Sequence, residues 1–143
     1  MKLPEPPKII TTLDLGGYTP ELKDVTLQVW VNPPGALFGK FYAFEATARA
    51  NAKQLSELLT APERDEEAIK AAVELRKENG LGRLEWLAEI LSQSPDKSTH
   101  WTPEELTAAF IEAYGQTDPQ LFWWVLLSVF TLINKHRTEL KNV

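Results

Sequence analysis

Two histidines, His100 and His136, and the acidic pair Glu104-Glu105 are the first side chains to consider for proton transfer or metal binding. His100 lies in a polar segment beside Trp101, and His136 lies in a basic stretch near the end. Neither has a second histidine at the helical spacing of a metal site. The acidic pair Glu104-Glu105 follows Thr102-Pro103, which is the pattern of a helix start with a capping box. These residues predict structural roles and no catalytic or metal site.

Other sequence patterns that carry chemistry are absent. No G-x-S-x-G nucleophile elbow, phosphate-binding loop, EF-hand or HExxH pattern occurs. Gly80-Leu81-Gly82 lacks the third glycine and the preceding strand of a dinucleotide site. Cysteine is absent, which excludes disulfides and thiol chemistry. The chain has a formal net charge of −5 and no cluster of five basic residues, which disfavours nucleic-acid binding. We expect a non-enzymatic protein with no cofactor, nucleic-acid or membrane partner.

The N-terminal third of the chain predicts a β-hairpin. Residues 9–15 and 25–31 alternate apolar and polar side chains, and Gly16-Gly17 lies in the turn between them. Ile10 and Trp30 would lie on the otherwise polar face of this hairpin. Residues 1–8 hold three prolines and predict an extended arm.

Helical patterns fill the rest of the chain. We expect helices over about 34–60, 63–79, 83–92, 102–114 and 118–141, with a hinge at Gly80-Leu81-Gly82. The predicted fold class is mostly α with an N-terminal β-hairpin (α+β), with about five helices in one domain over 1–143. This domain comprises the arm (1–8), the hairpin (9–32) and a helical region (33–143). The N-terminus has no secretory signal pattern, which favours the cytoplasm.

The last predicted helix is the most informative segment. Residues 121–133 carry only Ser128 and Thr131 as polar side chains, so the helix has no polar face for more than three turns. The run is shorter than the roughly 20 apolar residues that span a bilayer. It predicts either the central helix of the core or a surface that another chain covers. Because Phe122, Trp123 and Trp124 are consecutive, they point in directions about 100° apart.

Six aromatic residues are candidates for partner binding, although each could equally belong to the core. Large aromatic side chains are enriched at protein interfaces, and five tryptophans is a high number for 143 residues. The candidates are Trp30, Phe38, Tyr42, Phe122, Trp123 and Trp124.

The sequence resembles small proteins of long-tailed bacteriophages and prophages, the tail assembly chaperones. The resemblance rests on residues 6–15 (PPKIITTLDL) and 27–33 (LQVWVNP), in which a strand ending in Asp-Leu precedes a second strand ending in Val-Asn-Pro. The segments 84–91 (LEWLAEIL) and 101–106 (WTPEEL), followed by an aromatic-rich last helix, are also similar. The charged segment 63–79 has no counterpart in the family pattern.

The resemblance implies a chaperone that binds the long helical tape measure protein and assists polymerisation of the tail tube protein around it. It further implies self-association into a homo-oligomer, action in the host bacterial cytoplasm, and absence from the finished virion. A longer frameshifted form is also implied for many members. The alternatives are a structural phage particle component, such as a head-tail connector or tail completion protein, and a bacterial adaptor. A small enzyme is the remaining alternative.

Overall fold

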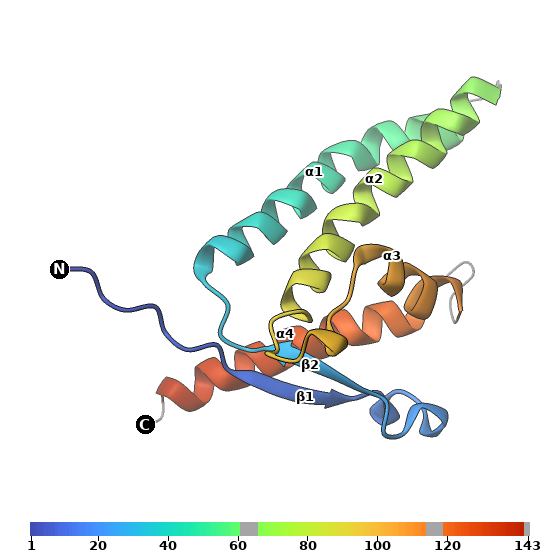
Figure 1. Cartoon of the computed structure of the whole chain (residues 1–143). Helices are drawn as coiled ribbons and strands as arrows, with labels where there is room; N and C mark the ends of the chain where they lie inside the picture. Colours follow the sequence, from blue (N-terminus) through green and yellow to red (C-terminus); the bar gives the residue numbers. More distant parts are fainter. Residues whose placement is uncertain (61–65, 114–118, 142–143) are drawn as a thin grey trace. The chain divides into compact units, whose positions relative to one another are not determined.

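The structure is a computed structural model that describes residues 1–60, 66–113 and 119–141. It is 70% helical and has an N-terminal two-stranded antiparallel hairpin, which confirms the predicted fold class. The strands are β1 (Ile10–Asp14) and β2 (Thr26–Trp30), and the described α-helices are α1 (Gly35–Thr60), α2 (Glu66–Ile90), α3 (Pro103–Leu106) and α4 (Gln120–Lys141) (Figure 1).

The chain divides into two compact units. One unit combines Met1–Pro33 with Leu87–Val143 and holds the hairpin, the last turn of α2, α3 and α4. The other unit is Pro34–Trp86 and holds α1 and most of α2. We call them the hairpin unit and the two-helix unit and describe each by itself.

The two predicted strands form an antiparallel hairpin. Ile10 lies opposite Trp30, and Leu13 lies opposite Leu27. Leu27 and Val29 of β2 and the following Val31 are buried on one face, whereas Val25, which precedes β2 in the same row, is exposed. Ile10 and Trp30 are half-buried on the other face. The apolar alternation therefore determined which face of the hairpin enters the core.

The connection between the strands is closed by local hydrogen bonds. The Asp14 carboxylate accepts a hydrogen bond from the Gly16 backbone at 2.7 Å, and Leu15 N donates to Val25 O at 2.9 Å. A Cβ added at Gly17 would lie 3.1 Å from Trp124 Cζ2, so this position favours a residue without a side chain. The adjacent Tyr18 ring lies 5.8 Å from the Trp124 ring. These contacts attach the turn of the hairpin to α4.

The helix α3 begins with the cap that its sequence predicts. Thr102 Oγ1 accepts a hydrogen bond from Glu105 N at 3.2 Å, and Pro103 occupies the first turn. The Thr102 hydroxyl also donates to the Glu105 carboxylate at 3.1 Å. The helix then widens into a π-helical segment over Thr107–Glu112. The predicted helix end at Tyr114 and the predicted cap at Asp118 lie outside the described residues.

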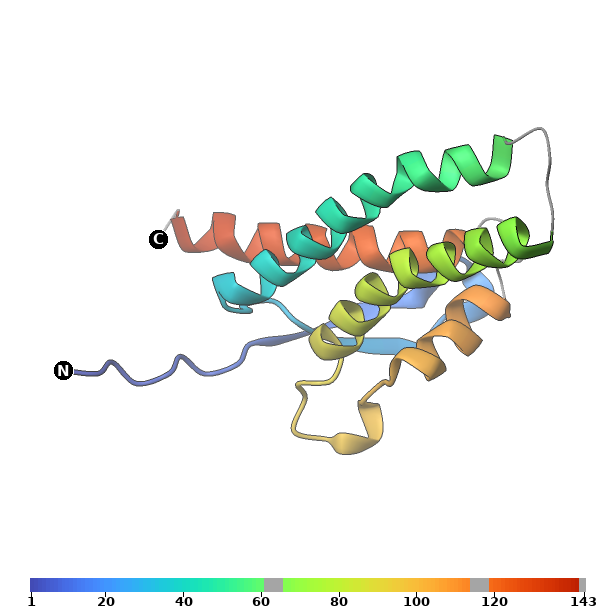
Figure 2. The ribbon, with the colours of Figure 1, turned by 90° about the horizontal axis from the view of Figure 1, so that it is seen from above.

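In the two-helix unit, α1 and α2 lie side by side, as Figures 1 and 2 show. The Arg83 guanidinium binds the Glu45 carboxylate through two hydrogen bonds of 2.6 and 2.9 Å. Trp86 Nε1 donates to Leu37 O at 3.0 Å, and its ring lies 4.9 Å from the Phe41 ring. Residues near the start of α1 therefore contact residues near the end of α2, so the two helices are antiparallel.

A row of α1 residues at alternating spacings of three and four is buried or half-buried. Such spacing is the pattern by which one helix packs along another. We call this the α1 row: Leu37, Phe41, Phe44, Ala48, Asn51, Leu55 and Leu58. In the first half of α2, Ala68, Ala72 and Leu75 are the less exposed residues, whereas Ile69 and Val73 are exposed.

The predicted helix break at Gly80-Leu81-Gly82 is wrong, because α2 runs without interruption from Glu66 to Ile90. None of the described glycines has a positive φ, so neither Gly80 nor Gly82 acts as a helix stop. A Cβ at Gly82 would lie only 2.8 Å from Phe44 Cβ and closer still to the ring. Gly82 is therefore the position at which α2 approaches the Phe44 side chain of α1 most tightly, and this packing offsets the low helix propensity of glycine.

Candidate functional site

The helix α4 presents two different faces. Its inner face is buried along more than three turns, by Leu121, Phe122, Val125, Leu126, Val129 and Ile133. Its outer face carries a second row at spacings of four, three, four, three and four residues. We call this the outer row: Trp123, Leu127, Phe130, Asn134, Arg137 and Lys141. Trp123 is 38% exposed and Leu127 is 66% exposed. The apolar helix is thus a core helix on one side and an exposed surface on the other.

The three consecutive aromatic residues of α4 have three different environments. Phe122 is buried at 4% exposure and its ring lies 5.7 Å from the Trp123 ring, edge to face. Trp124 is half-buried and lies against Tyr18 in the hairpin connection. The steps of 100° between neighbours explain this division. Trp123 is the most exposed of the three side chains, at 38%.

Trp30, the candidate on the hairpin, is contacted over its ring face by the N-terminal arm. Lys8 Nζ lies 5.2 Å from the centre of the Trp30 ring, within the range of a cation–π contact. The Asn32 side chain fixes the same arm, because its amide donates to Pro7 O at 2.9 Å and its oxygen accepts from Ile9 N at 2.7 Å. Trp30 Nε1 is buried with no hydrogen-bond partner. The half-buried Trp30 ring is therefore covered in part by the chain's own residues.

The two candidates on α1 differ in the same way as the aromatic residues of α4. Phe38 is buried at 8% exposure and its ring lies 6.3 Å from the Trp86 ring. Tyr42 is 63% exposed and touches the edge of Phe41, with ring centres 6.0 Å apart. Five of the predicted residues therefore lie on α4 and α1, while Trp30 lies on β2; Phe38 and Phe122 are buried.

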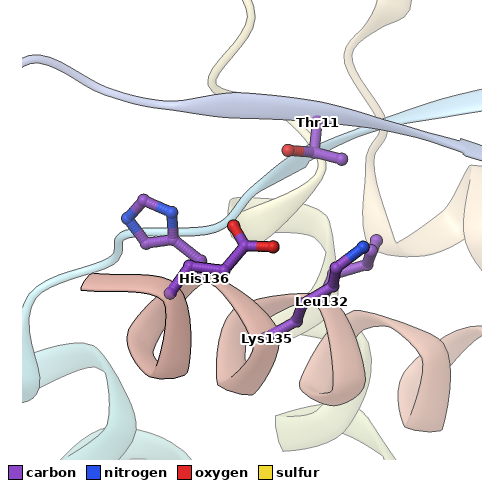
Figure 3. Close-up of a pocket in the computed structure, with 5 residues that line it drawn as sticks. Thr11, Leu132, Lys135 and His136 are labelled. Atoms are coloured by element: carbon purple, nitrogen blue, oxygen red, sulfur yellow. The ribbon is translucent and has the colours of Figure 1, made fainter. Parts of the chain in front are cut away.

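A shallow pocket lies between β1 and α4 and is too small for an ordinary ligand. It has a volume of about 110 Å³ and is lined by Thr11, Leu132, Lys135, His136 and Glu139. Figure 3 shows Thr11 on the strand above the side chains of the helix. Typical small-molecule sites have volumes of about 300–1,000 Å³. A pocket of this size with mixed charges is compatible with a few waters and does not indicate a substrate site.

His100 is part of a hydrogen-bonded loop. Its Nε2 donates to Ser94 O at 2.7 Å. Ser92 Oγ donates to Trp101 O at 3.0 Å and accepts from Trp101 N at 2.8 Å. These bonds give His100 and its neighbours a structural role in the segment that precedes α3. Within residues 1–60, 66–113 and 119–141, no group of three histidine or acidic side chains could hold a metal ion.

Asp96 in the same loop has the one resolved pKa shift among the described residues. The Ser98 hydroxyl and backbone N–H donate to Asp96 Oδ1 at 2.7 and 3.0 Å, and these bonds hold the pKa of Asp96 below its ordinary value of 3.8. Burial acts in the opposite direction and raises the pKa, and the nearby His100, which has the smallest of these effects, lowers it. This is the electrostatics of a turn and does not indicate an acid–base catalyst.

Our choice of partner-binding residues from the sequence omitted Leu127, the most exposed apolar side chain in the first half of α4. A signal for it was present, because Leu127 continues the spacing that runs from Trp123 to Phe130. Residues 121–133 are so uniformly apolar that the pattern alone could not show which row is turned outward. The structure separates the two rows.

Searches of known protein families, curated proteins and solved structures found no match to this chain. In the part of the chain that the structure describes, no helix has the length and apolar character needed to cross a membrane.

Proposed function

We propose that this protein is a non-enzymatic chaperone of the phage tail assembly kind, which binds a long helical client and shields its apolar surface. The client would be a tape measure protein, and the complex would assist polymerisation of a tail tube protein. In this proposal the chain acts as a homo-oligomer in the host bacterial cytoplasm and is absent from the finished virion. The family part of the proposal rests on the sequence resemblance in residues 6–15 and 27–33.

The observation that carries the proposal is the exposed outer row of α4. Trp123 and Leu127 are 38% and 66% exposed on a helix whose other face is buried in the core. Exposed apolar residues that lie along one row of a helix are the surface that binds an amphipathic helix of another protein. The net charge of −5 suits a protein that exposes such a surface and remains in solution.

The test is co-expression of the chain with the large helical product of the downstream gene. We expect the product to shift from the insoluble to the soluble fraction and to co-purify with the chain. Leu127→Asp should reduce this effect, while Leu140→Asp, at a similarly exposed leucine on another side of α4, should not. The contrary outcome is that the product stays insoluble, while this protein forms a ring of fixed size and is found in purified virions. The protein would then be a connector or another particle component.

A further inference from the structure

The N-terminal arm, residues 1–8, extends away from the hairpin in both views of the chain (Figures 1 and 2). Every residue of the arm is exposed, and Leu3 is 85% exposed. The arm contains Leu3-Pro4-Glu5-Pro6-Pro7, with a lysine on either side of this segment. Exposed apolar residues that lie together, rather than singly, are a candidate surface for contact with another protein.

Proline restricts the backbone of this segment at every residue. The rings of Pro4, Pro6 and Pro7 hold their own φ angles at about −65°. The residue before each proline is restricted to extended conformations, and this applies to Leu3, Glu5 and Pro6. The segment is therefore directed into the polyproline II conformation before any partner binds, so that binding costs little conformational entropy.

The residue types of the arm match the period of the polyproline II helix. This helix has three residues per turn, so its side chains form three rows. Leu3 and Pro6 lie in one row. Pro4 and Pro7 lie in the next row. The third row holds the charged residues of the arm, Lys2, Glu5 and Lys8. The arm therefore presents two adjacent apolar rows on one side and a charged row on the other.

The hairpin unit fixes the base of the arm without covering the apolar rows. The Asn32 amide donates a hydrogen bond to Pro7 O at 2.9 Å. The Lys8 ammonium donates to Gln93 Oε1 and lies 5.2 Å from the centre of the Trp30 ring. These contacts use a backbone oxygen and a cation of the charged row. They leave the side chains of the two apolar rows available to a partner.

We propose that residues 3–7 bind a partner protein through a groove of parallel aromatic side chains, of the kind by which SH3 domains bind proline-rich ligands. Such a groove takes a polyproline II helix by its apolar side. Leu3-Pro4 and Pro6-Pro7 are two apolar pairs separated by Glu5, and the segment spans about 12 Å at about 3.1 Å per residue. This site is separate from the outer row of α4 and does not rest on the chaperone proposal.

Two other modes of binding fit the arm less well. Pairing with a strand of another protein needs backbone N–H donors, and Pro4, Pro6 and Pro7 have none. Exchange of arms between two copies of the chain needs an aromatic groove on the receiving copy. The pocket between β1 and α4 does not provide one, because no aromatic ring other than the His136 imidazole lines it.

The experiment titrates the whole chain into an isolated, isotope-labelled SH3 domain and follows the amide signals of that domain by NMR. We expect saturable shifts at the groove, and none when the aromatic residues of the groove are replaced by alanine. Pro4→Ala and Pro7→Ala should each weaken binding by about fivefold or more, because each removes a ring from an apolar row. Glu5→Ala, in the charged row, is the matched control and should change the affinity by less than about twofold.

Exchange of the residues at positions 4 and 5 provides the sharper test. Pro4→Glu/Glu5→Pro keeps the composition, the charge and the three prolines of the arm, but it moves the carboxylate into an apolar row. This variant should lose affinity by about tenfold, because the groove would have to desolvate a charge. All these substitutions lie in the exposed arm, so the variants should unfold at the same urea concentration as the wild-type chain.

The titration can also contradict the proposal. It is wrong if the wild-type chain does not bind the SH3 domain, or if the exchanged variant binds as tightly as the wild type. It is also wrong if the SH3 domain does not bind and an oligomer of the chain dissociates on deletion of residues 2–6, since the arm would then join two copies. Client rescue in the co-expression assay tests a different surface, so either proposal can fail while the other stands.

Discussion

The α1 row and the outer row of α4 have the same spacing of three and four residues, but their surroundings differ. The α1 row contacts α2 within the two-helix unit at Phe41 and Phe44, which lie against Trp86 and Gly82. The outer row of α4 is exposed at Trp123, Leu127, Asn134 and Lys141, because the hairpin unit buries the opposite face of that helix. Helical periodicity thus predicts that a row of side chains will meet a helix, but does not say whether that helix belongs to the same chain.

The largest effect that we expect separates the two faces of α4. Val129 has 0% exposure on the inner face, so Val129→Asp would bury a charge without a partner and should destabilise the chain by about 5 kcal/mol or more. Leu127→Asp places the same charge on the outer row and should cost less than about 1 kcal/mol. Urea unfolding followed by circular dichroism measures both. Equal losses for the two variants would mean that the outer row is also core.

The next effect concerns the partner of the α1 row. Trp86→Ala removes a ring packed at 4.9 Å on Phe41 and a hydrogen bond to Leu37 O, and should cost about 3–5 kcal/mol. Tyr42→Ala on the exposed side of α1 is the matched control and should cost less than about 1 kcal/mol. The free energy of unfolding of the two variants gives the comparison. A small loss for Trp86→Ala would show that α1 and α2 depend little on this contact.

Two glycines of α2 should respond to the same substitution with opposite signs. Gly82→Ala would place a methyl group against Phe44 and should destabilise the chain by about 1–3 kcal/mol. Gly80→Ala meets no atom within 4 Å and should stabilise α2 by up to about 1 kcal/mol through its higher helix propensity. Thermal unfolding of both variants tests this. Stabilisation by both substitutions would mean that α2 does not approach α1 closely at Gly82.

The smallest effect concerns the loop before α3. Ser98→Ala removes the larger of the two hydrogen bonds that lower the pKa of Asp96, so the pKa should move back toward 3.8. The pKa of Asp96 is lower in the folded state than in the unfolded state. The ionised carboxylate therefore stabilises the loop when the pH is above the unfolded-state pKa. This contribution is lost as the pH falls through the folded-state pKa. Carbon NMR titration of Asp96 in both proteins measures the shift. An unchanged pKa in Ser98→Ala would assign the lowering to the backbone of Ser98 instead.

Local sequence patterns predicted much of the fold because local chemistry determines it. The strand alternation set the hairpin and its buried face, and Thr102-Pro103 set the start of α3. The hydrophobic run 121–133 predicted both a core helix and a possible interface, and the structure contains a buried face and an exposed row on the same helix. The same reasoning wrongly predicted a helix break at Gly80-Leu81-Gly82, where α2 is continuous. The reason is that α2 packs at Gly82 against Phe44 of α1, which is distant in the sequence.

The sequence by itself therefore determined the hairpin, the helical segments apart from the junction at Gly80-Leu81-Gly82, and the aromatic residues that are candidates for partner binding. Only the tertiary structure decided which aromatic residues are buried, since Phe122, Trp123 and Trp124 are nearly equivalent as a sequence pattern and differ only in their neighbours. The physical reason is that burial depends on which surfaces meet. Rotations of 100° between adjacent helical residues then place one ring in the core, one against the hairpin and one at the surface.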